Sequence, residues 1–270
     1  MQSVIAPRIV ACSNIKGGEG KTTIARHLAH YAEERKRKTL AIDLDPQGDL
    51  TASLIPSDIE VDDECTSSAE LFMDGFDPAK VKVVSVSPYL DVLQSTDDLD
   101  EITDLDERSA LIKRARDVIR KIAGHYDVVI IDTPTNASTC YKTGMAAAHV
   151  TVSPLQLDTY GMRGAEKFLR KSNQVKSTYN PALKHLGFVV NRFNSRSKSH
   201  RQLVSEVRDA GFTLLPTVLR ERAAVQDALD RQMPVWRGKS GTVNRTAANE
   251  FKAMCAEVFG AAGVKFPEAA

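Results

Sequence analysis

The chain has 270 residues, a formal net charge of +1, 42% hydrophobic residues and 26% charged residues. This composition is typical of a compact globular protein and argues against a disordered or fibrous chain. No apolar run approaches the roughly 20 residues that span a bilayer, and the four cysteines are dispersed without a C-x-x-C pair. We therefore expect a single domain over residues 1–270 of a cytoplasmic protein, with no secretory signal, zinc site or disulfide framework.

Charge is distributed unevenly along the chain. Acidic residues crowd residues 58–107, whereas basic residues dominate residues 163–208. This asymmetry indicates a surface that faces a polyanion. Solvated helix faces that happen to cluster would give the same pattern.

Apolar runs alternate with segments of helical periodicity along the chain. The runs predict buried strands at residues 9–12, 39–43, 90–93, 128–132, 150–153, 186–191 and 213–215. The segments between and after them predict helices at residues 21–35, 109–124, 164–178, 199–210, 223–231 and 246–259. This order predicts an α/β fold with a doubly wound, mostly parallel β-sheet flanked by helices and right-handed crossovers. Residues 55–66 are the best candidate for a mobile loop.

A glycine-rich loop follows the first predicted strand. Residues 16–23 read Lys-Gly-Gly-Glu-Gly-Lys-Thr-Thr and open the first helix. In such a loop, backbone N–H groups converge on a triphosphate, Lys21 neutralises its oxygens, and the Thr22 hydroxyl can ligate Mg²⁺. The first glycine of an ordinary P-loop would stand at position 15, which is Ile15, and a second lysine stands at Lys16. This is the deviant Walker A pattern, and its expected nucleotide-binding residues are Gly17, Gly18, Glu19, Gly20, Lys21, Thr22 and Thr23.

A second motif lies at the end of the second predicted strand. Residues 41–49 place Asp43 and Asp45 before a proline and a glycine that turn the chain. Ligands of open α/β sheets gather at these strand ends, so a catalytic role is favoured. Two aspartates there more often cap the next helix or turn when no P-loop is nearby.

A third motif covers residues 126–134. Its β-branched run predicts a central strand, and the run ends in Asp132. This is the Walker B pattern, in which we expect Asp132 to hold Mg²⁺ through a water molecule.

Together, the three motifs resemble those of the ParA/MinD family of deviant Walker A P-loop ATPases, and the resemblance extends from Arg8 to about Phe259. It implies that ATP and Mg²⁺ are bound and that ATP drives a sandwich homodimer. Lys16 would then reach across to the partner's phosphates in the manner of an arginine finger, with no contact inside its own chain. Asp45 would position the attacking water, and Asp43 would support the metal and the lysine Lys21.

The chain departs from the family pattern in two places. Glu19 stands where relatives mostly carry an apolar residue, and a carboxylate near a triphosphate is unfavourable by on the order of 1 kcal/mol. We expect Glu19 to meet a basic side chain across the dimer interface or from a partner, or else to face outward. Residues 135–138, Thr-Asn-Ala-Ser, replace the family's second proline and S-L-G-like turn.

Two further groups of residues follow from the resemblance. Asn191 corresponds to an asparagine that lies against the adenine base, and Arg220 stands where relatives usually have a proline on the other side of the ring. The basic segment 192–201 enters a helix and suits contacts with DNA phosphates. The expected DNA-binding residues are Arg196, Lys198, Arg201 and Arg222; the alternative is a solvated helix entrance.

The resemblance implies a ParA-like ATPase that rides on nonspecific double-stranded DNA of the nucleoid. It would position a cargo, whether a plasmid, a chromosome region or a protein organelle, and a ParB-like or cargo-adaptor protein would stimulate hydrolysis. A MinD-like membrane-cycling ATPase would need a C-terminal amphipathic helix, which residues 260–270 do not offer. A metal-cluster carrier would need closely spaced cysteines, and Cys140 has no such neighbour in the sequence.

Overall fold

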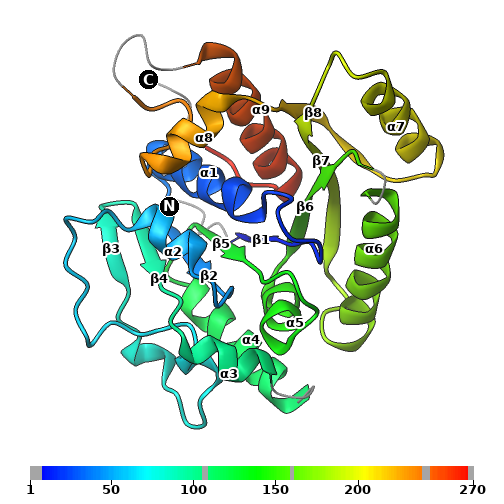
Figure 1. The fold of residues 1–270 in the computed structure, drawn as a ribbon. Coiled ribbons are helices and arrows are strands. Elements are labelled where there is room, and N and C mark those ends of the chain that lie inside the picture. The colour runs from blue at the N-terminus through cyan, green and yellow to red at the C-terminus, as the bar shows by residue number, and fades with distance from the viewer. Residues whose placement is uncertain (1–7, 105–108, 159–160, 239–243, 267–270) are drawn as a thin grey trace.

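The computed structural model describes residues 8–104, 109–158, 161–238 and 244–266. Its core is an eight-stranded sheet with the order β3-β4-β2-β5-β1-β6-β7-β8. Neighbouring strands run parallel except β3 and β4, which are antiparallel. Helices cover both faces of this sheet (Figure 1). The doubly wound, mostly parallel α/β fold predicted from the sequence is therefore confirmed.

All seven predicted strands are present. The strands are β1 Arg8–Cys12, β2 Thr39–Asp43, β3 Val84–Ser87, β4 Leu90–Leu93, β5 Val128–Asp132, β6 Val150–Gln156, β7 Lys184–Phe193 and β8 Leu214–Arg220. The sequence analysis missed β3, a short edge strand. It also placed the ends of β6, β7 and β8 too early, because these strands continue through polar residues toward their carboxyl ends.

The six predicted helices are also present, and three more were missed. The helices are α1 Lys21–Glu34, α2 Asp49–Leu54, α3 Asp98–Asp104, α4 Ser109–Ala123, α5 Thr139–Ala147, α6 Gly161–Thr178, α7 Lys198–Asp209, α8 Ala223–Asp230 and α9 Arg245–Ala262, with 3₁₀ turns at Glu70–Phe72 and Pro78–Lys80. Of the missed helices, α5 is buried along almost its whole length and so has no polar face to give a helical period. Residues 55–66 form turns, and their mobility remains a prediction. None of the helices in the described ranges is both long and apolar enough to cross a bilayer.

The core consists of two apolar layers, one on each face of the sheet. Alternate residues of β1 enter different layers, with Ile9 and Ala11 in the layer under α4, α5 and α6. Val10 and Cys12 enter the layer under α1 and α9, as the period of two in a strand requires. The carboxyl ends of the central strands therefore open at one edge between two packed layers of helices (Figure 1).

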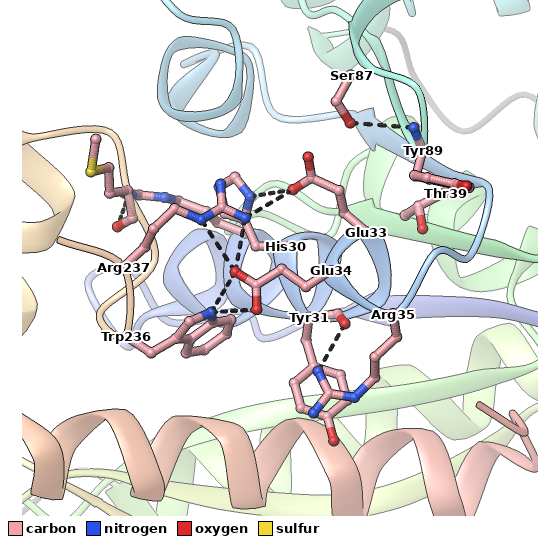
Figure 2. Close-up of polar contacts among 12 residues, drawn as sticks. His30, Tyr31, Glu33, Glu34, Arg35, Thr39, Ser87, Tyr89, Trp236 and Arg237 are labelled. Carbon is pink, nitrogen blue, oxygen red and sulfur yellow. Dashed lines mark hydrogen bonds and ion pairs between the residues drawn. The ribbon is translucent and has the colours of Figure 1, made fainter. Parts of the chain in front are cut away.

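The far end of α1 is anchored to the segment that follows α8. Trp236 Nε1 lies 2.9 Å from each oxygen of Glu34, and Arg237 Nη2 lies 2.8 Å from Glu34 Oε1 (Figure 2). The guanidinium of Arg35 lies over the ring of Tyr31, 3.3 Å from its centroid. These contacts hold the C-terminal end of α1 in place.

Two buried polar side chains hold the middle of α1 against the same segment. Arg26 Nη2 donates to the carbonyl of Ala228 at 2.9 Å and also to that of Met233. His27 Nδ1 lies 2.6 Å from the carbonyl of Thr23, and its Nε2 accepts the N–H of Val235 at 3.1 Å. This second bond requires a bare Nε2, and burial lowers the pKa of His27 to about 3. The ring is thus neutral, with its proton on Nδ1.

Candidate nucleotide-binding site

The three sequence motifs meet at the carboxyl edge of the sheet. β1, which leads into the glycine-rich loop, lies between β5 and β6. In the register of the sheet, Asp132 is paired with Cys12 on one side and with Asp43 on the other. The loop of residues 13–20 and the ends of β2 and β5 therefore converge, as a nucleotide site of this fold requires.

Glycine is required at position 20 of the loop. Gly20 has φ +103, and a Cβ there would lie 2.4 Å from Asn191 Nδ2. That amide donates to the carbonyl of Glu19 at 2.7 Å. Asn191, expected at the adenine base, thus also fixes the end of the phosphate loop.

Glu19 points into the protein rather than toward solvent. The residue is 1% exposed, its Oε1 lies 2.8 Å from Lys16 Nζ, and its Oε2 accepts the N–H of Gln156 at 2.5 Å. Burial raises the pKa of Glu19, although Lys16 and the Gln156 N–H counteract this. The outward-facing alternative is wrong, and the basic partner expected from a second subunit comes from Glu19's own loop.

Lys16 is held by two carboxylates of its own chain. Besides Glu19, its Nζ lies 2.5 Å from Asp158 Oδ2. Burial disfavours the charge of Lys16, but the bonds to Asp158 and Glu19 outweigh burial and raise its pKa. The expectation that Lys16 has no contact inside its chain is therefore wrong, because the end of β6 delivers Gln156 and Asp158 beside the loop.

Lys21, Thr22 and Asp132 form the centre of the site. Lys21 is 5% exposed, and Thr22 Oγ1 donates to Asp132 Oδ2 at 2.5 Å. Burial and the charge of Asp43 raise the pKa of Asp132 to about 8. The charge of Lys21 and the bond from Thr22 counteract this increase only in part. A divalent cation beside Thr22 would stabilise the carboxylate of Asp132 further.

Asp43 contacts the turn that follows its own strand. Its Oδ2 accepts the N–H and the hydroxyl of Thr51 at 2.8 and 2.9 Å, and its Oδ1 accepts the N–H of Asp45 at 3.1 Å. Burial raises the pKa of Asp43 to about 6 against these bonds. Asp43 therefore holds the turn and the start of α2, as in the alternative in which the aspartates of this motif cap the next helix or turn. Asp45 is only partly buried, and its water-positioning role stays a prediction.

A cavity of about 360 Å³ lies beside the phosphate loop, where we expect the adenine base. Its lining includes Gly20, Asn191, Arg220 and Phe251. The backbone N–H of Arg220 donates to Glu250 Oε2 at 3.1 Å, and its guanidinium pairs with the same carboxylate. The structure therefore places Asn191 and Arg220 in one cavity, and whether adenine binds there stays a prediction.

The basic residues expected to bind DNA divide into two groups. Arg196 lies in the loop after β7, and Lys198 and Arg201 lie in the first turn of α7; all three are exposed. Arg222 is partly buried and lies 3.2 Å from Glu250 Oε1. Arg196, Arg220 and Arg222 nevertheless line one hollow of about 370 Å³. Whether any of them binds DNA stays a prediction.

The sequence analysis missed three residues that organise the site: Gln156, Asp158 and Glu250. Gln156 and Asp158 lie at the end of a strand next to β1, where ligands of this fold gather, and that position alone could have identified them. Glu250 is a 9% exposed carboxylate on the mostly apolar helix α9. A carboxylate on a buried helix face signals a cationic partner.

The comparisons with known proteins agree with this geometry. The family model described as an AAA domain matches residues 7–185. The chain is 34% identical over 205 residues to the chromosome partitioning protein ParA of Myxococcus xanthus, covering 74% of this chain and 70% of that protein. It is 28% identical over 232 residues to ParA of Caulobacter vibrioides, covering 84% and 86%.

Solved structures show the same fold. A cobyrinic acid a,c-diamide synthase from Mycobacterium smegmatis with bound ADP and magnesium has a TM-score of 0.76 and 28% identity, covering 98% of this chain and 99% of that chain. An ATP complex of McdA from Cyanothece has a TM-score of 0.82 and 21% identity, and the match covers 98% of this chain and 99% of that chain. With the deviant Walker A loop, the Walker B strand and the ParA relatives in agreement, this chain belongs to the ParA/MinD family of P-loop ATPases.

Proposed function

We propose that this chain is a ParA-like ATPase that binds ATP with Mg²⁺, dimerises on ATP and binds DNA without sequence preference. In this function it segregates or positions a cargo, and a partner protein stimulates hydrolysis. The observation that carries the proposal is the convergence of Lys21, Thr22 and Asp132 at one strand edge, with Lys16 in the same loop.

The residues present fit Mg²⁺. Among the described residues no group of three or more His, Cys, Asp or Glu side chains could hold a metal ion alone. Mg²⁺ suits such a site because it is commonly bound by one or two protein oxygens together with substrate phosphates and water. Thr22 and Asp132 would hold it, and it would neutralise phosphate charge. The raised pKa of Asp132 supports this fit, since burial and the charge of Asp43 outweigh Lys21 and the Thr22 hydroxyl, and a cation would stabilise the carboxylate further.

We infer roles for the chain's own residues. The loop N–H groups and Lys21 bind the β- and γ-phosphates. Asp45, which follows β2 and is partly exposed, accepts a hydrogen bond from the attacking water and orients it. Lys16 leaves Glu19 and Asp158 and reaches the phosphates of the second subunit.

The two alternative functions, a membrane-cycling ATPase and a metal-cluster carrier, have less support in the structure. The last helix described, α9, buries its apolar residues against α1 and β8 in the core and so cannot also insert them into a membrane surface. Cys12, Cys140 and Cys255 are buried, which does not suit thiolates that share a cluster between subunits.

Three measurements on the full chain test the proposal. ATP hydrolysis, dimerisation by light scattering and binding to a random-sequence DNA duplex would each be measured with ATP, with ADP and without nucleotide. We expect dimerisation and salt-sensitive DNA binding only with ATP. Lys21→Ala should lose ATP binding, whereas Lys16→Ala should bind ATP and remain a monomer. A Lys16→Ala protein that dimerises and hydrolyses ATP normally would contradict the proposal.

A further inference from the structure

A second cavity lies at the edge of the sheet opposite the candidate nucleotide site. It has a volume of about 840 Å³ and is formed by the first residues of β1, β6 and β7 together with α4 and the end of α9. Because parallel strands begin at this edge and deliver the P-loop and Asp132 to the other, the two sites are separated by the length of the strands. The volume lies within the range of roughly 300–1,000 Å³ that is usual for small-molecule sites.

The lining of this cavity is strongly basic. Arg8, Arg116, Arg120 and Lys184 contribute cations from β1, α4 and β7, and none of the described lining residues is acidic. A carboxylate near the rim, Asp117, pairs with Arg116 at 2.8 Å. At least three positive charges therefore face one hollow without a carboxylate partner in its lining.

Two side chains of the lining, His149 and Arg8, carry N–H groups that can donate to a ligand. His149 Nδ1 accepts the backbone N–H of Ile9 at 3.0 Å, so its proton is carried on Nε2. Burial and the nearby charges of Arg120 and Arg8 lower the pKa of His149, which keeps the ring in that neutral form. The Nε of Arg8 is buried and has no hydrogen-bond partner among the described residues. Both side chains can donate to a bound ligand, and together with the basic lining they favour an anion.

Arg120, on the wall of the cavity, binds the partly negative C-terminal end of α5. Its guanidinium donates to the last carbonyls of α5, those of Ala146 and Ala147, at 3.0 and 3.3 Å. Burial and the charge of Arg116 lower the pKa of Arg120, because two cations are held near one another. The helix end and the nearby Asp117 carboxylate counteract this repulsion, and an anion in the cavity would counteract it further.

We propose that this cavity binds a small anion carrying two or more phosphate groups. Guanidinium groups match phosphate oxygens in pairs, and a lysine adds a point charge. The site is a hollow lined from several elements rather than a projecting basic surface, which favours a small phosphate compound over a duplex. This inference does not depend on the proposed function, since none of the residues involved lies at the candidate nucleotide site.

The test uses inorganic tripolyphosphate as the probe and the full chain loaded with ADP and equimolar Mg²⁺, so that the P-loop is filled. Isothermal titration calorimetry should show one tripolyphosphate bound per chain. Lys184→Glu and Arg8→Gln should each weaken this binding about tenfold, as expected for a lost charged hydrogen bond. Lys184 is exposed, so its replacement leaves the fold intact, and thermal melting of the free variant would verify this.

The matched control is Lys80→Glu, the same charge reversal at an exposed lysine in a 3₁₀ turn outside this cavity. It should bind tripolyphosphate as the wild type does. Absence of binding to the ADP-loaded chain, or equal affinities in all variants, would overturn the proposal. Titration with a random DNA duplex forms the second arm. If Lys184→Glu weakens duplex binding but leaves tripolyphosphate binding unchanged, the cavity belongs to a nucleic-acid surface instead.

Discussion

The ammonium group of Lys16 and the carboxylate of Glu19 lie 2.8 Å apart within one phosphate loop. The lysine that marks this family is thus tethered inside its own subunit, and Asp158 adds a second contact. If Lys16 must reach a second subunit, both contacts have to break first. Their strength then acts against dimerisation.

Removing the charge of Glu19 should therefore promote the dimer. Glu19→Gln keeps an oxygen that can accept the N–H of Gln156 but loses the ion pair with Lys16. We expect ATP-dependent dimerisation at about three- to tenfold lower protein concentration, since Lys16 is partly exposed and its pairs are screened by solvent. Light scattering across a concentration series measures this. Asp158→Asn should act in the same direction, and a dimerisation constant unchanged in both variants would rule the tether out.

A side chain at position 20 should damage the loop. In Gly20→Ala the new Cβ would lie 2.4 Å from Asn191 Nδ2, and φ +103 is strained for alanine. We expect the free energy of unfolding to fall by about 1–3 kcal/mol and nucleotide affinity to fall at least about tenfold. Urea unfolding and ADP titration measure the two effects. The control is Gly260→Ala in α9, where a Cβ would meet open space, and it should stabilise the protein by about 0.5–1 kcal/mol. Normal ADP binding by Gly20→Ala would contradict the described loop conformation.

Freeing Arg220 and Arg222 should strengthen DNA binding. Glu250 pairs with both guanidiniums, and these contacts lower its pKa against the effect of burial. In Glu250→Gln we expect about three- to tenfold tighter binding to a random duplex. The slope of log affinity against log salt concentration should steepen by about the amount of one further phosphate contact. Fluorescence anisotropy over a salt series measures both.

The control for this experiment is Glu257→Gln on the same helix. Glu257 accepts bonds from the N–H and hydroxyl of Thr217, so its replacement removes the same charge without releasing an arginine. Equal gains in DNA affinity for the two variants would mean that only net charge matters.

Acid should destabilise the protein partly through His185. Its ring lies between Phe168 and Phe188, at 5.1 and 4.8 Å between centroids, and burial lowers its pKa to about 4. The unfolded state, with a pKa near 6.5, therefore takes up this proton first as the pH falls. The contribution of the neutral His185 ring to the free energy of unfolding is fully present above about pH 6.5 and is lost as the pH falls toward 4. Between pH 7 and pH 5 this loss is about 2 kcal/mol.

His185→Phe removes this titration. Urea unfolding at pH 7 and pH 5 should show that the variant loses about 2 kcal/mol less than the wild type over that interval, whatever its stability at pH 7. If His185→Phe keeps the wild-type pH dependence, the buried neutral state of the ring is refuted.

The sequence predicted the sheet well because its central strands are buried on both faces. β5, Val-Val-Ile-Ile-Asp, is buried throughout, and such a run has few other interpretations. The same burial explains why α5 was missed. Almost all of its residues are buried, so its sequence lacks the polar face that would show a helical period of 3.6 residues.

The site was predictable where a motif fixes both residue type and backbone. Lys21, Thr22 and Asp132 meet because a loop and a neighbouring strand end at the same edge. The partners of Lys16 and Glu19 were not predictable, because a sequence does not show which way a loop side chain points. Gln156 reaches Glu19 from 137 positions away, a contact that only the folded sheet creates.

Helix α1 joins two ends of the molecule that the chain itself keeps far apart. Its first turn carries Lys21 and Thr22, its second holds Arg26 and His27 against residues 228–235, and its last meets Trp236. The ring centroid of His27 also lies 4.2 Å from that of Phe251, which lines the cavity beside Gly20. A shift of this helix must therefore move the surroundings of the chain's single tryptophan. The fluorescence emission of Trp236 should therefore respond to any movement that α1 transmits from the phosphate loop, without an added label.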